Sequence, residues 1–177
     1  MNATPATATW RIAMFVLVLS SIVWLGGANI RAMIGNHLLR FGTTEFDDVI
    51  APEAEREIFR LLSLASLTVI GSYLTVVIAG SVFLVTSPFR LKEHGWLMMS
   101  AILFYVFLPV EVFTMILDGR MVYLEFFTTA GSQEFRELFI ARLTALAGVP
   151  FIGTLCYITI IGLAVFQPLK LTDRHTS

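Results

Sequence analysis

The sequence predicts an all-α integral membrane protein, built as a bundle of four transmembrane helices in a single domain, residues 1–177. Hydrophobic residues make up 56% of the 177 residues and charged residues only 14%, whereas soluble domains carry roughly 25% charged residues. The mean hydropathy is +0.80. This composition excludes a soluble globular domain and a disordered chain, because too few polar side chains are present to face water.

Four apolar runs cover about residues 10–32, 59–85, 95–117 and 139–166. Each run exceeds the roughly 20 residues that a helix needs to cross a hydrocarbon core of ~30 Å. Backbone groups find no water partner in that core, so each run is predicted to be helical. At about 1.5 Å per residue the second run would be ~40 Å long, so we expect it to tilt or to project from the membrane.

The charges suggest an orientation for the four spans. Both termini and the loop between spans two and three share one side, which carries five basic and two acidic residues. The other side carries seven arginines and ten carboxylates. The short basic loop favours cytoplasmic termini under the positive-inside rule, although the raw count of basic residues points the other way. We therefore expect a multi-pass protein of the plasma or bacterial inner membrane.

A comparison of the chain with itself at an offset of 80 residues indicates an internal repeat. Residues 56–59 return as 136–139, and residues 88–91 return as 168–171, with similar charged and proline positions. Shared membrane-helix composition is the competing explanation of these matches. We interpret 56–91 and 136–171 as parts of two duplicated helical hairpins, related by a pseudo-twofold axis along the membrane normal.

Two longer connections are expected on the outer side. Pro52 and Ser132 each precede acidic residues, which is typical of a helix start, so the second and fourth helices should begin outside the apolar runs. The aromatic-containing segments 35–51 and 119–131 are expected to be short interfacial pieces or surfaces for a partner protein.

Glu111 lies within the third apolar run, two residues after Pro109. A carboxylate at that depth is costly unless it is paired, protonated or hydrated. It is interpreted either as a polar clamp that bonds a neighbouring helix or as a proton-relay or ligand-binding group, with the clamp favoured. By depth, Asn29 and Arg31 are its expected partners, together with the backbone freed by Pro109.

Polar residues also gather where the first span ends, at Asn29, Arg31, Asn36 and His37. They are suited to grip a lipid phosphate or a cofactor headgroup. The simpler interpretation is helix-end capping, with Arg31 extended toward the interface. On the second span, Gly71, Thr75 and Ala79 recur every four residues, a spacing that lets a neighbouring helix approach closely, either within the chain or from another subunit.

Several chemistries find no support in the sequence. The three histidines, His37, His94 and His175, lie beyond the ends of the spans. His94 and His175 share a side and could form a surface metal site, but solvated loop histidines are the favoured interpretation. Because the chain has one cysteine, Cys156, and no histidine within a span, neither a metal site nor a haem site is predicted. Zinc-protease, phosphate-loop and serine-hydrolase motifs are missing. A net charge of −1 predicts no nucleic-acid partner.

These observations favour a non-catalytic accessory or scaffold subunit of a larger membrane complex, such as an energy-converting one. The expected partners are the lipid bilayer and either other membrane subunits or further copies of the chain. Two alternatives stay open. One is a small homo-oligomeric transporter or channel that uses Glu111, and the other is a membrane subunit that holds a quinone or haem near His37 and Arg31. The sequence identifies no cofactor.

Overall fold

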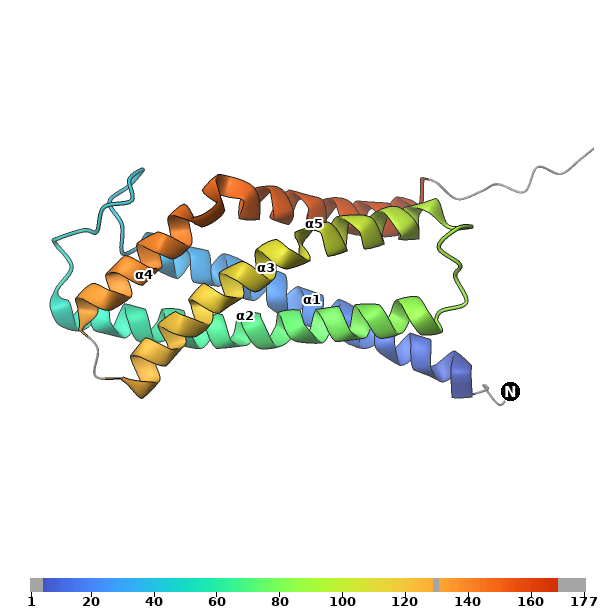
Figure 1. Ribbon diagram of the computed structural model, residues 1–177, viewed down its shortest axis with the longest axis horizontal. Coiled ribbons are helices and arrows are strands. Elements are labelled where there is room, and N and C mark those ends of the chain that lie inside the picture. The colour runs from blue at the N-terminus through green and yellow to red at the C-terminus, as the bar shows by residue number, and fades with distance from the viewer. Residues whose placement is uncertain (1–4, 129–130, 169–177) are drawn as a thin grey trace, which may run out of the picture.

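The structure is a computed structural model that describes residues 5–128 and 131–168. Its elements are α1 (Pro5–Asn36), α2 (Pro52–Thr86), α3 (Gly95–Phe127), α4 (Ser132–Thr144), the 3₁₀ turn η1 (Ala145–Gly148) and α5 (Val149–Phe166) (Figure 1). Among the described residues, the β-structure is limited to one isolated bridge, between Leu39 and Phe46. Helices α1, α2, α3 and α5 are long and apolar enough to cross a membrane. The predicted all-α fold with four such helices is confirmed.

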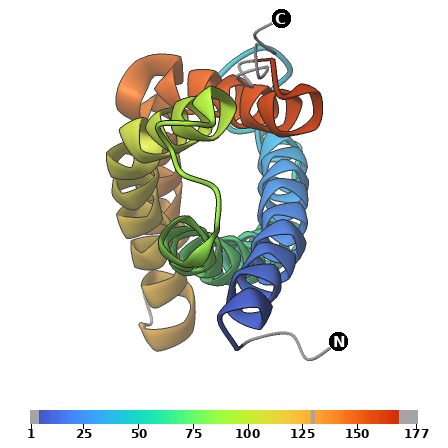
Figure 2. The ribbon, with the colours of Figure 1, turned by 90° about the vertical axis from the view of Figure 1, so that its right-hand side faces the viewer.

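Viewed from one end, the four long helices follow one another around the bundle axis in the order α1, α2, α3, α5 (Figure 2). Helices α1 and α2 form an antiparallel hairpin, and α3 packs against α2, α4 and α5. We call the end that holds residues 37–51 and the starts of α2 and α4 the head end. The opposite end, with the start of α1 and residues 87–94, is the tail end.

Small residues set the separation and register of α1 and α2. A Cβ atom added to Gly27 would lie 3.3 Å from Val69, and one added to Gly35 would lie 3.8 Å from Leu62. Residue numbers therefore fall along α1 as they rise along α2, as an antiparallel pair requires. Because Arg31 lies between the two glycines, its backbone is level with the part of α2 between Leu62 and Val69.

The fourth apolar run, expected as one helix over about 139–166, is broken at η1. The backbone adopts positive φ angles at Leu146 (63°) and Gly148 (90°). Pro150 then occupies the first turn of α5. A proline ring clashes with the carbonyl group four residues earlier, which here belongs to Leu146, and glycine tolerates the left-handed conformation that ends a helix. Together these residues end α4 and start α5.

The connections at the head end also differ from the sequence-based expectation. Segment 119–131 was expected to hold an interfacial piece, but α3 continues to Phe127. Tyr123 and Phe127, four residues apart, stack at 5.8 Å, a spacing that favours continued helix. Segment 35–51 contains the end of α1 and then turns, closed by backbone hydrogen bonds such as Asp47 N–H to Leu38 O at 2.9 Å.

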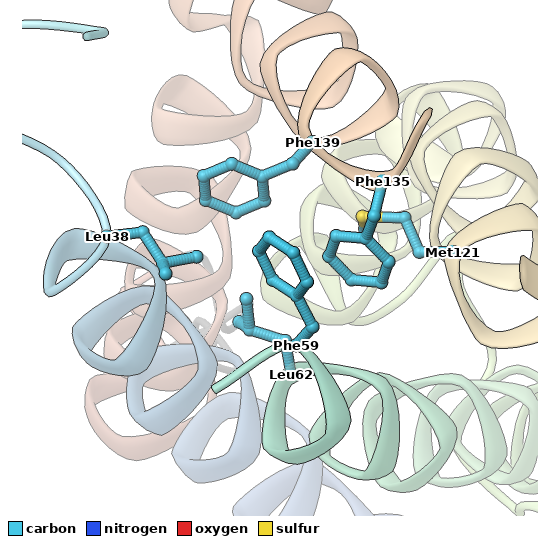
Figure 3. Close-up of a cluster of buried hydrophobic side chains, with 6 residues drawn as sticks. All are labelled: Leu38, Phe59, Leu62, Met121, Phe135 and Phe139. Atoms are coloured by element: carbon cyan, nitrogen blue, oxygen red, sulfur yellow. The ribbon is translucent and has the colours of Figure 1, made fainter. Parts of the chain in front are cut away.

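Three buried clusters hold the helices together. The head cluster, drawn in Figure 3, consists of Leu38, Phe59, Leu62, Met121, Phe135 and Phe139. The middle cluster consists of Trp24, Val69, Tyr73, Val76 and Tyr157. The tail cluster consists of Ala13, Phe83 and Leu97. Each cluster joins side chains from at least three helices, so the clusters locate the bundle interior from one end to the other.

Candidate functional site

A buried carboxylate between two arginines is the most unusual arrangement in the bundle. Asp118 on α3 has a side chain that is only 2% exposed, and its Oδ2 atom accepts a hydrogen bond from Nη1 of Arg31 on α1. Its Oδ1 atom accepts a hydrogen bond from Nε of Arg142 on α4, at 3.1 Å. The two arginine side chains are 13% and 18% exposed. This charge cluster therefore ties three helices together, with both carboxylate oxygens bonded.

Sequence reasoning missed this cluster because Asp118 was counted among the outer charges. The position of Asp118 seven residues after Glu111 was a usable signal. Residues seven apart lie two turns apart on one face of a helix, so Glu111 and Asp118 had to point from the same side of α3. The arginine partner from α4 had no such signal, because its position depends on how the broken fourth run packs against α3.

Glu111 bonds a different helix from the one expected. Its Oε1 atom accepts a hydrogen bond from the Tyr157 hydroxyl on α5 at 3.2 Å, and neither Asn29 nor Arg31 bonds it. Side chains on a helix lean toward the helix N-terminus. For α5 this is the direction of the head end, so the Tyr157 side chain extends toward the head end and meets Glu111. Arg31 is instead engaged by Asp118. The Tyr73 hydroxyl is buried near this pair and forms no hydrogen bond with the described residues.

The polar residues predicted to cluster at the end of α1 separate in the structure. Only Arg31 reaches the bundle interior. Asn29 is exposed and donates a hydrogen bond from Nδ2 to the Leu25 carbonyl of its own helix, at 2.8 Å. Asn36 and His37 are exposed at the end of α1. Asn36 belongs to the last turn of the helix, and the His37 N–H bonds the carbonyl of Ile34.

The small residues predicted for helix packing on α2 also face different surroundings. Ala79 is buried, whereas Gly71 and Thr75 are exposed. A Cβ atom at Gly71 would meet nothing within 4 Å, and the Thr75 hydroxyl bonds the Gly71 carbonyl at 2.9 Å. A close approach between helices is found on α5, at Gly153, where an added Cβ atom would lie 3.1 Å from the Phe107 side chain of α3.

A second ion pair closes the head end. Arg136 on α4 donates to both carboxylate oxygens of Glu55 on α2, from Nε at 2.5 Å and from Nη2 at 2.6 Å. The Arg136 guanidinium also lies 4.9 Å from the ring centroid of Phe46. The hydrogen bonds to Glu55 raise the pKa of Arg136 above its ordinary value, so the guanidinium keeps its charge. A bidentate pair with an aromatic face fixes the start of α4 over the start of α2.

Among the described residues, no three His, Cys, Asp or Glu side chains gather into a metal-binding group. His94 Nδ1 lies 3.2 Å from the Arg90 carbonyl, and His175 lies outside the described residues. The arrangement around Asp118 and Glu111 can hold helices together and can stabilise charge in a region of low polarity.

The Glu111–Tyr157 contact leads to a first testable expectation. Glu111→Leu should lower the free energy of unfolding by about 1–2 kcal/mol, the scale of hydrogen bonds between membrane helices. Glu111→Gln should be nearly neutral, because an amide oxygen still accepts the tyrosine hydroxyl. Tyr157→Phe removes the same bond, so its effect and that of Glu111→Leu should not add in equilibrium unfolding in lipid or detergent. Additive losses would mean that the two side chains do not interact.

Comparison of the chain with known protein families, with curated proteins and with solved structures finds no match.

Proposed function

We propose that the protein is a non-catalytic accessory or scaffold subunit of a larger integral-membrane assembly, such as an energy-converting complex. The observation that carries this proposal is the break at η1. Leu146 and Gly148 are exposed there, so a short 3₁₀ turn with two residues of positive φ is uncovered on the side of the bundle.

The exposure of η1 is significant because of its position along the bundle axis. Arg142 of α4 pairs with Asp118, and Gly153 of α5 packs on Phe107. Because η1 lies between Arg142 and Gly153 in the chain, it is level with the part of α3 between Phe107 and Asp118. Large apolar side chains are exposed around this level, namely Leu64, Leu67, Val112, Ile116 and Leu143. Irregular backbone in a hydrocarbon region is tolerated only where protein or water covers it, which favours a neighbouring subunit at η1.

The charged groups of the bundle interior support a structural role. Arg31, Asp118 and Arg142 satisfy one another, and Glu111 bonds Tyr157. Below them, toward the tail end, the interior is filled by the middle cluster with Phe104 and Phe107, and then by the tail cluster. A transporter that used Glu111 would need a polar route past these aromatic and aliphatic layers.

The orientation remains part of the proposal, with the head end outside and the termini in the cytoplasm. Single cysteines at Ser132 and Lys92, in a Cys156→Ala background, test it in intact cells. An impermeant thiol reagent should label Ser132→Cys and spare Lys92→Cys. The reverse pattern would invert the topology and leave the fold unaffected.

We also propose that the two helical hairpins arose by duplication. Helix α2 runs from 52 to 86 and the α4–η1–α5 unit from 132 to 166, so both bounds differ by 80 residues. The end of the second repeat, 169–171, lies outside the described residues. In an experimental structure, residues 56–88 should superpose on 136–168 by a rotation near 180° about the bundle axis, with the deviation concentrated at η1.

The subunit role is tested by extraction of the full chain from its native membrane in mild detergent, followed by measurement of particle mass and composition. We expect a particle well above 19.7 kDa that contains other polypeptides in fixed ratio. A particle made only of this chain would support the transporter or channel alternative. Visible haem absorbance or a bound quinone would support the cofactor-holding alternative.

A further inference from the structure

A groove of about 550 Å³ runs along one side of α4 at the head end. Phe46 forms one wall, and α4 side chains spaced three or four residues apart form the other. The side chains nearest the start of α4 are polar, namely Gln133, Arg136 and Glu137. Those nearer its end are Ile140 and Ala141, followed by Thr144, whose hydroxyl bonds the Ile140 carbonyl at 2.9 Å. The groove is largely open, and its lining changes from charged to mainly apolar along its length.

The groove crosses the level at which the exposed surface of the bundle changes from charged to apolar. A Cβ atom at Gly35 would meet Phe139 of α4 at 3.1 Å and Leu62 of α2 at 3.8 Å, so these positions share one level. Exposed His37 and Arg60 lie on the head side of it, and exposed Leu64 lies on the other side. In a bilayer, this is the level where headgroups meet acyl chains.

The charged side chains of the groove are arranged in advance of any ligand. Glu55 holds Arg136 through the Nε and Nη2 atoms of its guanidinium, and Phe46 supports the guanidinium plane. The Nη1 amino group has no partner among the described residues and can donate to a phosphate. Glu137 accepts the Gln133 amide on Oε1 at 3.0 Å, and its Oε2 atom is free to accept a bond from an ammonium group.

We propose that this groove binds one zwitterionic phospholipid. Its phosphate bonds Arg136, its ammonium group bonds Glu137, and an acyl chain lies along Ile140 and Ala141. Charge complementarity selects this class of lipid over an anionic one. Arg136, Glu55 and Glu137 together carry a charge of −1, which repels a headgroup of net negative charge and accepts one that brings its own cation. The site requires only that the helices cross a membrane, so it does not depend on the subunit role proposed above.

Native mass spectrometry of the full-length protein, released from nanodiscs made of equal parts phosphatidylethanolamine and phosphatidylglycerol, tests the proposal. The wild-type protein should retain one phosphatidylethanolamine in preference to phosphatidylglycerol. Glu137→Gln should lower that preference by about fivefold, the upper end for a partly exposed ion pair. Glu134→Gln is the matched control, because Glu134 is exposed on the same helix and does not line the groove.

Equal retention of the two lipids by the wild-type protein would overturn the proposal, as would a preference for phosphatidylglycerol. An equal effect of Glu134→Gln would also overturn it, because the preference would then follow the total charge of α4 and not the groove. A photoreactive group at Ala141 gives an independent readout. It should label lipid, and exclusive labelling of a polypeptide would assign the groove to a protein partner instead.

Discussion

Asp118→Asn is expected to lower the free energy of unfolding by about 3–5 kcal/mol, the largest effect of any single polar substitution in the bundle. The reason is the loss of one partner from a buried ion pair, which leaves an uncompensated charge in a region of low polarity. In this protein two guanidinium groups, from Arg31 and Arg142, would then face each other without the carboxylate between them. Reversible unfolding by denaturant in mixed micelles measures the difference.

Glu93→Gln is the matched control for Asp118→Asn. It removes a carboxylate from the Arg90–Glu93 pair, in which the nitrogen and oxygen lie 3.4 Å apart and the side chains are 81% and 56% exposed. Exposed pairs contribute about 0–1 kcal/mol. If Asp118→Asn cost no more than Glu93→Gln, the charge cluster would not be what holds α1, α3 and α4 together.

Phe59→Ala should cost about 3–5 kcal/mol, the range for removal of a large aromatic side chain from a packed core. Phe59 is 2% exposed in the head cluster. It stacks on Phe135 with ring centroids 4.2 Å apart (Figure 3). The truncation would leave a void between α2 and α4. The loss of stability should therefore appear as a lower unfolding midpoint, and the start of α4 should detach from the bundle first.

Phe127→Ala makes the same chemical change at a ring that is 73% exposed at the end of α3. Its expected effect is within about 0.5 kcal/mol, as for other surface substitutions. Hydrogen exchange of the α4 amides separates the two variants, because only loss of Phe59 should speed exchange in the first turns of α4. Equal protection in both variants would contradict the assigned role of the head cluster.

Helix existence was predictable from composition, whereas helix ends were not. An apolar run longer than 20 residues has few alternatives to helix in hydrocarbon, so α1, α2 and α3 were expected. The expected third span stopped at residue 117, near the first outer charge, Asp118, yet that side chain turns inward and the helix continues to Phe127. Hydropathy cannot distinguish a charge at the end of a span from a charge that is paired within the bundle.

The break in the fourth run had a local signal that hydropathy alone hides. Gly148 and Pro150 lie two residues apart, which is typical of a helix end followed by a new helix start. The hydrogen-bond partners of the polar residues were harder to predict from the sequence. Glu111 was recognisable as unusual from its position, but Tyr157 lies in an apolar run, and its pairing depends on the relative register of α3 and α5. Such register is a property of packing between helices and leaves no periodic trace in one sequence.

The most direct test of the proposed subunit role is site-specific photo-cross-linking from the break in the fourth helix. A photoreactive amino acid at Leu146, activated in native membranes, should form a covalent adduct with one polypeptide of different sequence. The same probe at Phe15, a 68% exposed residue of α1, measures the background from random contacts. Adducts from Leu146 that contain only lipid, or only a second copy of this chain, would contradict the account.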